Sequence, residues 1–182
     1  MANEKLSLGD VTLRYPRVSD AKRSFEILNN KNFHYLASHP KSIQNEKDFL
    51  KNATKNRKKN LRHDFAILYR GIVIGGIGVK INQHMNWIGE MGFFIEERYW
   101  GKGITTRAIK LFERYCFKTL KLHRIEILMN PKNYASEKVA IKNKYEKEGL
   151  LRSIVKNRAG KWSDNLLYAK INSDGKAEGL HV

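Results

Sequence analysis

The sequence FFIEERYWGKGITT, from Phe93 to Thr106, is the most informative stretch of this chain about its fold. It begins within an apolar run that predicts a β-strand from Ile88 to Ile95, and it ends where an amphipathic helix begins. Two glycines one residue apart, Gly101 and Gly103, lie between them. At such a helix start, the backbone N–H groups and the positive end of the helix dipole form an anion site suited to a pyrophosphate. A tight strand-to-helix turn also explains these glycines, so the loop alone does not identify a function.

Hydrophobic periodicity outside this stretch predicts further strands and helices. Strands are expected at Val11–Tyr15, Phe65–Tyr69, Ile72–Ile81, Arg124–Met129, Leu150–Lys156 and Trp162–Ile171. Helices are expected from Ser19 or Asp20 to Leu28, from Ser42 into a basic run, from Ile104 to about Thr119, and from Tyr134 to about Asn143. Only the stretch from Ile88 to Met129 has the strand–helix–strand order of a parallel crossover, so the sheet should be mixed.

Length and composition indicate one globular domain. The 182 residues contain no repeats, low-complexity blocks or Pro/Gly/Ser linkers, so we expect a single domain over residues 1–182 with a flexible tail at 172–182. The single cysteine, Cys116, cannot form an intrachain disulfide. The start lacks the apolar stretch of a signal peptide, and the longest apolar run, 71–79, is too short to span a bilayer. These features predict a cytoplasmic protein with no membrane contact.

Charge is the unusual feature of the composition. The chain has 35 Lys and Arg against 18 Asp and Glu, which gives a formal net charge of +17. Six basic residues and no acidic one lie from Lys51 to Arg62, at positions 51, 55, 57, 58, 59 and 62. This basic patch, 51–62, is either a solvated face or a surface that docks RNA, a ribosome or an acidic protein. The net charge disfavours small polycationic ligands unless a local acidic pocket compensates for the repulsion.

Short motifs follow one another in order along nearly the whole chain, over residues 6–171. They are Thr12-Leu13-Arg14, Ser19-Asp20-Ala21, Tyr99-Trp100-Gly101-Lys102-Gly103-Ile104, Leu122-His123-Arg124-Ile125-Glu126, Asn130-Pro131, Asn133-Tyr134-Ala135-Ser136, and Asp164 with Leu167-Tyr168-Ala169. In combination they resemble the GNAT N-acetyltransferase superfamily, in particular its RimJ/RimL-like branch. The resemblance implies an α/β (α+β) fold with a mixed, mostly antiparallel central sheet flanked by helices, whose splayed strands form the acetyl-CoA site. It also implies acetyl-CoA as co-substrate and no metal.

The resemblance further assigns roles to individual residues. Backbone groups of Phe93, Phe94 and Ile95 are expected to pair with the pantetheine arm. The pyrophosphate is expected to bind the amides of Gly101, Lys102, Gly103, Ile104, Thr105 and Thr106. Asn133 is expected to hydrogen-bond the pantetheine, and Ser136 to lie near the thioester sulfur, where its hydroxyl can donate to the departing thiolate. Ser136 is also a suitable N-cap for the short helix that follows, and both roles could hold.

Some positions depart from the family pattern. Thr105 stands where Ala or Gly is usual, so a methyl and a hydroxyl must fit beside the phosphates. Lys144 replaces the glycine that ends the short helix, so either a left-handed non-glycine residue costs about 1 kcal/mol or the helix ends differently. Ala140 replaces the tyrosine that acts as general acid in many members, which leaves Ser136 as the candidate for that role.

The acceptor side of the site is less sharply defined. Glu90 is the candidate to take the proton from the amine, directly or through water, and a surface carboxylate paired with a lysine is the alternative. His34 and Tyr35, between the first two helices, and His84 and Trp87, before the cofactor strand, are expected to line the acceptor pocket. Packing at the rim or in the core is their alternative role. The histidines lack metal-ligand spacing, which argues against a metal site.

These observations predict an acetyl-CoA-dependent N-acetyltransferase that transfers acetyl directly to a bound primary amine. The favoured acceptor is the N-terminal amine of a protein, of the ribosomal-protein type. An α-amino group with a pKa of about 8 is partly neutral at cytoplasmic pH, whereas a lysine with a pKa near 10.4 is almost wholly charged. The alternatives are a small amine acceptor, such as a polyamine or an aminoglycoside, and a non-catalytic CoA-binding or RNA-binding module. The chain is expected to act as a monomer or a homodimer.

Overall fold

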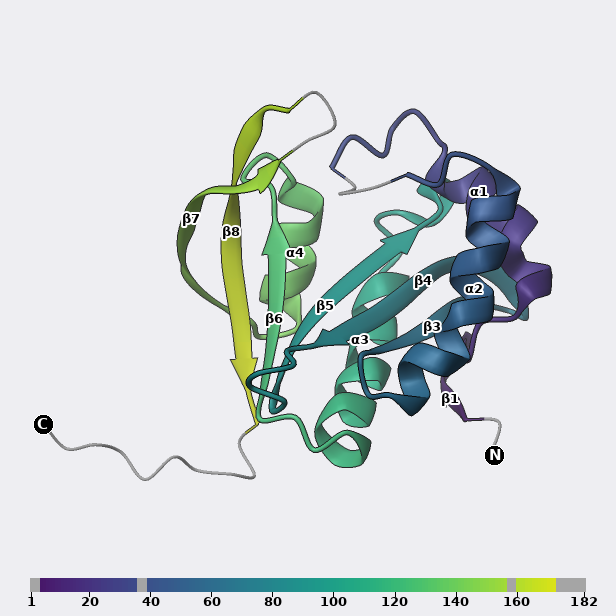
Figure 1. Cartoon of the computed structure of the whole chain (residues 1–182), viewed down its shortest axis with the longest axis horizontal. Helices are drawn as coiled ribbons and strands as arrows, with labels where there is room; N and C mark the ends of the chain where they lie inside the picture. The colour runs from purple at the N-terminus through teal and green to yellow at the C-terminus, as the bar shows by residue number, and fades with distance from the viewer. Residues whose placement is uncertain (1–3, 36–38, 157–159, 173–182) are drawn as a thin grey trace, which may run out of the picture.

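The computed structural model describes residues 4–35, 39–156 and 160–172. These residues contain an eight-stranded sheet with the strand order β1-β2-β3-β4-β5-β6-β8-β7 (Figure 1). The strands are β1 Lys5–Leu8, β2 Val11–Arg14, β3 Arg62–Tyr69, β4 Ile72–Ile81, β5 Ile88–Ile95, β6 Arg124–Met129, β7 Glu146–Lys156 and β8 Trp162–Ile171. The parallel pair is β5 with β6, and the other pairs are antiparallel. The predicted mixed sheet is therefore confirmed.

The sequence pattern missed one strand and shortened two others. The first strand, β1, pairs with β2, but it has only four residues, three of them exposed, which is too short to give a clear periodic signal. Strand β7 begins at Glu146 rather than at Leu150, because its charged first residues lie on an edge strand and are solvated. The start of β3 at Arg62 was missed because two polar residues, His63 and Asp64, are buried there. Of the expected tail, residues 173–182 lie outside the described residues.

Helices cover both faces of the sheet. Two of them, α1 Ala21–Leu28 and α2 Ile43–Lys58, contact each other and pack on β4 and β3. The others, α3 Ile104–Arg114 and α4 Tyr134–Lys142, lie behind the sheet in Figure 1. A π-helical turn, Tyr115–Thr119, continues α3 to the end that the sequence predicted. Helix α1 follows a 3-10 turn at Val18–Asp20, and its N-cap is Asp20, one of the two predicted caps, although the Asp20 side chain makes no capping hydrogen bond to α1.

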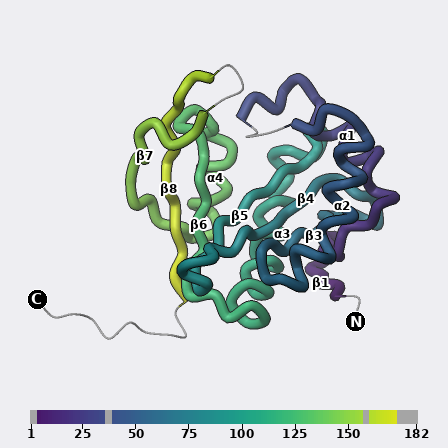
Figure 2. Tube along the Cα trace, in the orientation of Figure 1, coloured from purple at the N-terminus to yellow at the C-terminus, as the bar shows by residue number. Residues whose placement is uncertain are grey.

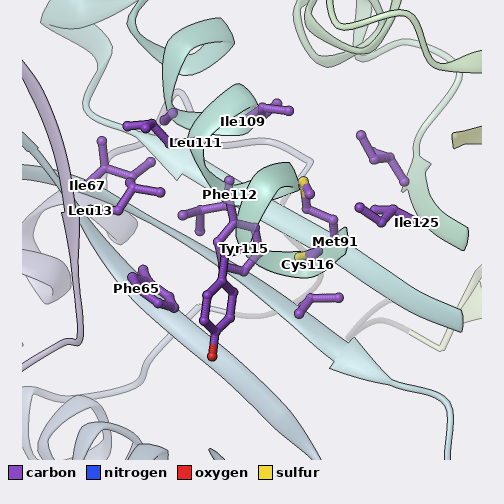
Figure 3. Close-up of a cluster of buried hydrophobic side chains, with 14 of the residues drawn as sticks. Leu13, Phe65, Ile67, Met91, Ile109, Leu111, Phe112, Tyr115, Cys116 and Ile125 are labelled. Atoms are coloured by element: carbon purple, nitrogen blue, oxygen red, sulfur yellow. The ribbon is translucent and has the colours of Figure 1, made fainter. Parts of the chain in front are cut away.

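The main core lies between the sheet and α3 (Figure 3). Phe112 on α3 is fully buried, and its ring lies 5.4 Å from that of Phe65 on β3 in an edge-to-face arrangement. Cys116 is also fully buried. This packing fixes the position of α3 and therefore of the glycine loop at its start.

Helix α4 ends at a lysine with left-handed backbone. Lys144 has φ 61°, its N–H donates to the carbonyl of Ile141 at 2.9 Å, and the N–H of Tyr145 donates to the carbonyl of Ala140 at 3.0 Å. These two bonds form a Schellman motif, which normally uses glycine at this position. The first of the two predicted alternatives is thus confirmed.

A buried histidine makes the stability of the fold depend on pH. His63 on β3 is 5% exposed, with Nδ1 2.8 Å from the Tyr115 hydroxyl and Nε2 2.8 Å from Oδ1 of Asn60. Burial and, to a smaller extent, the positive charge of Arg57 lower the pKa of His63 to about 4. The neutral ring is therefore the form that the folded state stabilises.

We expect the contribution of His63 to stability to be lost as the pH falls. The unfolded chain binds a proton at a pKa near 6.5, whereas the folded chain does so only near 4, so the loss between pH 7 and pH 5 is about 2 kcal/mol. Urea denaturation of the wild type and of His63→Gln at both pH values measures it. The difference between the two proteins cancels the opposite effect of buried carboxylates with raised pKa. An equal loss of unfolding free energy between pH 7 and pH 5 in the wild type and in His63→Gln would contradict this expectation.

Candidate active site

The sheet opens between β5 and β6. The two strands pair over three positions, from Ile88 with Arg124 to Glu90 with Glu126. Beyond Glu90 the ladder stops, although β5 continues to Ile95 and remains paired with β4 on its other side. Figures 1 and 2 show the strands side by side at the bottom of the view and diverging toward the top. The edge of β5 that faces β6 from Gly92 onward is thus available to pair with an extended ligand.

The glycine loop lies at the end of β5 and starts α3. Gly101 and Gly103 have φ of 73° and 68°, a backbone conformation that requires glycine for low strain. Gly103 is the N-cap of α3, and with no side chain it offers no acceptor to the first N–H groups of the helix. The first helical hydrogen bond of α3 is the one that the Arg107 N–H donates to the Gly103 carbonyl. The backbone N–H groups before it belong to Ile104, Thr105 and Thr106. This arrangement suits a pyrophosphate.

The start of α4 carries the two polar residues that the sequence singled out. Asn133 is the N-cap of this helix, and its Oδ1 accepts a hydrogen bond from the Ser136 backbone N–H at 3.2 Å. The alternative role of Ser136 as the N-cap is therefore wrong, because Asn133 occupies that position three residues earlier. Ala140, in the place of the family's tyrosine, is fully buried in the core.

We expect two substitutions of Asn133 to separate helix capping from coenzyme binding. Asn133→Ala removes both the cap and the amide donors, and should cost about 1 kcal/mol of stability. Asn133→Ser keeps a capping hydroxyl, so the melting temperature should stay near that of the wild type while the affinity for CoA falls at least fivefold. Thermal melts and calorimetry with CoA measure the two effects. An Asn133→Ser protein that binds CoA like the wild type would limit Asn133 to its capping role.

A large cavity joins these elements. Its volume is about 1690 Å³, which exceeds the usual pocket for one small ligand and leaves room for a coenzyme and an acceptor. Most of the residues expected at the site line it: His34, Tyr35, Glu90, Phe93, Phe94, Ile95, Gly101, Gly103, Thr105, Thr106, Asn133 and Ser136. Lys102 is exposed on the loop and Ile104 is buried beneath it, so neither side chain lines the cavity.

The expectation that His84 and Trp87 line the acceptor pocket is wrong. Both lie in the loop between β4 and β5, at the end of β5 opposite the glycine loop, and neither lines the cavity. Position in the sequence immediately before the cofactor strand suggested otherwise. A strand of eight residues, however, separates its two ends by about 25 Å.

The segment that carries His34 and Tyr35 is tied to the glycine loop. The Glu97 carboxylate, in the turn before the loop, accepts hydrogen bonds from the side chains of Asn30 at 3.0 Å and Asn32 at 2.7 Å. These bonds lower the pKa of Glu97. One cavity wall is thus formed by a segment about 65 residues away in sequence.

Three acidic residues line the cavity although the sequence did not predict them as site residues. Asp20 is paired with Arg14 through two bonds of 2.8 Å. Glu46 on α2 and Asp64 on β3 are both 7% exposed. Burial raises the pKa of Glu46, and the charge of Asp64 raises it further. Burial also raises the pKa of Asp64, which Arg62 lowers in part. No local motif marks Glu46 or Asp64, and the motif that contains Asp20 gave it no place in the cavity, because the fold alone brings these carboxylates together.

The basic patch, 51–62, is partly used within the fold. The Arg57 guanidinium lies 3.6 Å from the centre of the Tyr15 ring, and Arg62 donates to Asp64 at 2.7 Å. Lys51 lies 3.6 Å from Asp48 on the same helix. The exposed remainder is Lys55, Lys58 and Lys59, a smaller surface than the sequence suggested.

Two absences concern the described part of the chain. Residues 4–35, 39–156 and 160–172 hold no group of three or more His, Cys, Asp or Glu side chains arranged to bind a metal ion. Within the same ranges, no helix combines the length and the apolar character needed to cross a membrane.

A sheet that opens beside a glycine-rich helix start defines a class of coenzyme A-dependent acyltransferases. The family model of the acetyltransferase (GNAT) domain matches residues 10–146, so the chain belongs to the GNAT acetyltransferase family, as its motifs predicted. The probable N-acetyltransferase YjcK of Bacillus subtilis is 42% identical over 84 residues, 46% of each chain. The chain thus matches about half the length of this relative. The ribosomal-protein-serine acetyltransferase of Escherichia coli is 27% identical over 72% of this chain and 75% of its own length.

Solved structures share the fold. The ribosomal-protein-S5-alanine acetyltransferase of Vibrio fischeri superposes with a TM-score of 0.83 at 25% identity, over 96% of this chain and all of its own. RimL, a ribosomal L7/L12 α-N-protein acetyltransferase, was solved with coenzyme A; its TM-score is 0.84 at 19% identity, over 92% of this chain and 98% of its own. The mixed, mostly antiparallel GNAT fold is thereby confirmed.

Proposed function

We propose that this chain is an N-acetyltransferase that moves the acetyl group of acetyl-CoA directly to a primary amine, with the N-terminal amine of a protein as the favoured acceptor. The observation that carries the proposal is the convergence on one cavity of the open edge of β5, the glycine loop and the start of α4. Family membership and the ribosomal-protein acetyltransferases among its relatives support it.

Each part of the site would have its own role in coenzyme binding or in the reaction. The amides at the start of α3 would hold the pyrophosphate, and the backbone of Phe93 to Ile95 would pair with the pantetheine arm. When bound, acetyl-CoA supplies an activated thioester. The Ser136 hydroxyl would donate to the sulfur as the thiolate leaves, and Glu90, on the cavity side of β5, would accept the amine proton directly or through water.

A separate prediction concerns Ser136. Because Asn133 supplies the helix cap, Ser136→Ala should leave the melting temperature within about 1 °C and CoA affinity within twofold, while kcat falls at least tenfold. Steady-state kinetics alongside thermal melts give both quantities. Unchanged turnover in this variant would remove Ser136 from the chemistry.

The experiment that tests the function is mass spectrometry of ribosomal proteins and of an amine panel after incubation with the protein and labelled acetyl-CoA. We expect labelled protein N-termini. Rapid labelling of spermidine or an aminoglycoside, with unlabelled protein N-termini, would assign a small amine as the acceptor. The assignment to the acetyltransferases would stand. Absence of CoA binding by calorimetry would overturn the proposal as a whole.

A small amine remains the second candidate because the cavity is lined by carboxylates. The net charge of +17 disfavours a polycation at long range, but Glu46, Asp64 and Glu90 provide a local acidic pocket. The amine panel in the same experiment distinguishes the two acceptors.

A further inference from the structure

Asp64 is buried, and within the described residues only one of its two carboxylate oxygens has a hydrogen-bond partner. It borders the cavity and is 7% exposed. Its Oδ1 accepts from Arg62 Nε at 2.7 Å, whereas its Oδ2 is covered and has no hydrogen-bond partner within the described residues. A buried carboxylate oxygen without a donor carries a desolvation cost that a bound cation or donor would relieve.

A second buried carboxylate adds to the negative charge beside Asp64. Glu46 on α2 is also buried and also borders the cavity, and its electrostatic interaction with Asp64 is unfavourable to the charged form. Arg62 is the cation hydrogen-bonded to Asp64, and Arg57 acts on it from a greater distance while its guanidinium stacks on Tyr15. This corner of the cavity therefore favours a further positive charge.

The floor between Asp64 and the open edge of the sheet has no side chains. Asp64 lies opposite Gly78 on β4, and Gly78 lies opposite Gly92 on β5. A Cβ at Gly78 would lie 2.3 Å from Asp64 Oδ1, whereas a Cβ at Gly92 would meet nothing within 4 Å. A bare strip of backbone therefore runs from the edge of β5 to Asp64, and Glu90 and Phe94 flank Gly92 on the same face.

Distance excludes a direct role for Asp64 in deprotonating the reacting amine. The Asp64 carboxylate lies over Gly78 on β4, and adjacent strands are spaced by about 4.8 Å, so this carboxylate stays about one strand spacing from the backbone of β5. A base must approach the proton donor to about 3 Å. An amine at the open edge of β5 is therefore out of its reach, but another part of the same acceptor can reach Asp64 along the glycine strip.

We propose that Asp64, together with Glu46, forms a cation subsite for the acceptor, and that the preferred acceptor carries a second positively charged nitrogen, an ammonium or a guanidinium, beyond its reacting amine. This inference rests on the proposed function and deepens it. In a peptide acceptor the second nitrogen belongs to a lysine or arginine near the N-terminus. In a small molecule it is the far amine of a diamine. Either nitrogen would supply Asp64 Oδ2 with the donor that it lacks.

The test compares matched acceptors on the wild type and on Asp64→Asn. Peptides that begin Ser-Lys or Ser-norleucine form one pair, and 1,4-diaminobutane with 1-aminobutane forms the other. We expect the wild type to favour the charged member by at least tenfold in kcat/KM. In Asp64→Asn the charged acceptor should lose at least tenfold, mainly through KM, while the neutral one changes less than twofold. Asp48→Asn, an exposed carboxylate on α2 outside the cavity, is the matched control and should behave as the wild type.

Direct binding separates failure of the subsite from failure of the proposed function. Calorimetry with 1,4-diaminobutane on the CoA-loaded protein should give binding to the wild type and to Asp48→Asn, and at least tenfold weaker binding to Asp64→Asn. Equal use of charged and neutral acceptors by the wild type would overturn the subsite and leave the acetyltransferase intact. Binding that depends on Asp64 without acetylation of any acceptor would support the subsite and overturn the proposed function. The affinity of Asp64→Asn for CoA should lie within twofold of the wild-type value, which verifies that the variant is folded. The acceptor pair that the wild type uses better, peptides or small amines, identifies the source of the second charged nitrogen.

Discussion

Gly92→Leu will reduce acetyl transfer at least 100-fold in kcat/KM while the affinity for CoA changes less than threefold. Gly92 lies in the open part of β5, lines the cavity, and leaves empty space where a Cβ would stand. A leucine there is tolerated by the backbone but occupies the strip along which we propose that the acceptor lies. Displacement of a reacting group by about 1 Å can cost on the order of 100-fold in rate, and a leucine displaces it by more.

The fold should not suffer from this change. Glycine within a strand is destabilising by about 0.5–1 kcal/mol, so the melting temperature of Gly92→Leu should equal or exceed that of the wild type. Gly149→Leu on β7 is the matched control, because a Cβ there also meets nothing within 4 Å and the residue lies outside the cavity. Kinetics, calorimetry and thermal melts on all three proteins complete the test. A Gly92→Leu enzyme with wild-type kcat/KM would show that acceptors do not cross β5 at this position.

Phe112→Ala will have the largest effect on stability. The side chain is fully buried, and it contacts the rings of Phe65 and Tyr115 with centroids 5.4 and 5.9 Å away. Truncation removes this burial and leaves a cavity, so we expect a loss of about 3–5 kcal/mol in the free energy of unfolding. Urea denaturation at pH 7 measures it. Because α3 presents the glycine loop, the variant should also bind CoA more weakly.

An exposed residue provides the control for the core. Ile141 on α4 is 56% exposed, so Ile141→Ala should cost less than about 0.5 kcal/mol. A Phe112→Ala protein with a loss as small as that of Ile141→Ala would mean that α3 repacks readily and does not rigidly position the loop.

The elements with strong local signals could be predicted from the sequence. The β4–β5–α3–β6 region was recognised because apolar periodicity and the glycines of the loop are signals that act over a few residues. The same holds for Asn133 and Ser136, which share one turn of helix. The bounds of β3 and β7 were missed where charged or polar residues open a strand, because what is buried there depends on neighbours far away in sequence.

The acidic corner of the cavity was decided by the tertiary structure. Glu46, Asp64 and Gly92 lie on three different elements, and only the strand register and the packing of α2 bring them to one surface. The same register carries His84 and Trp87 to the opposite end of β5. Sequence determined the fold class and the glycine loop because their physical causes, periodicity, capping and left-handed glycines, are local. The acceptor side depends on long-range pairing and on burial of charge, which no local pattern encodes.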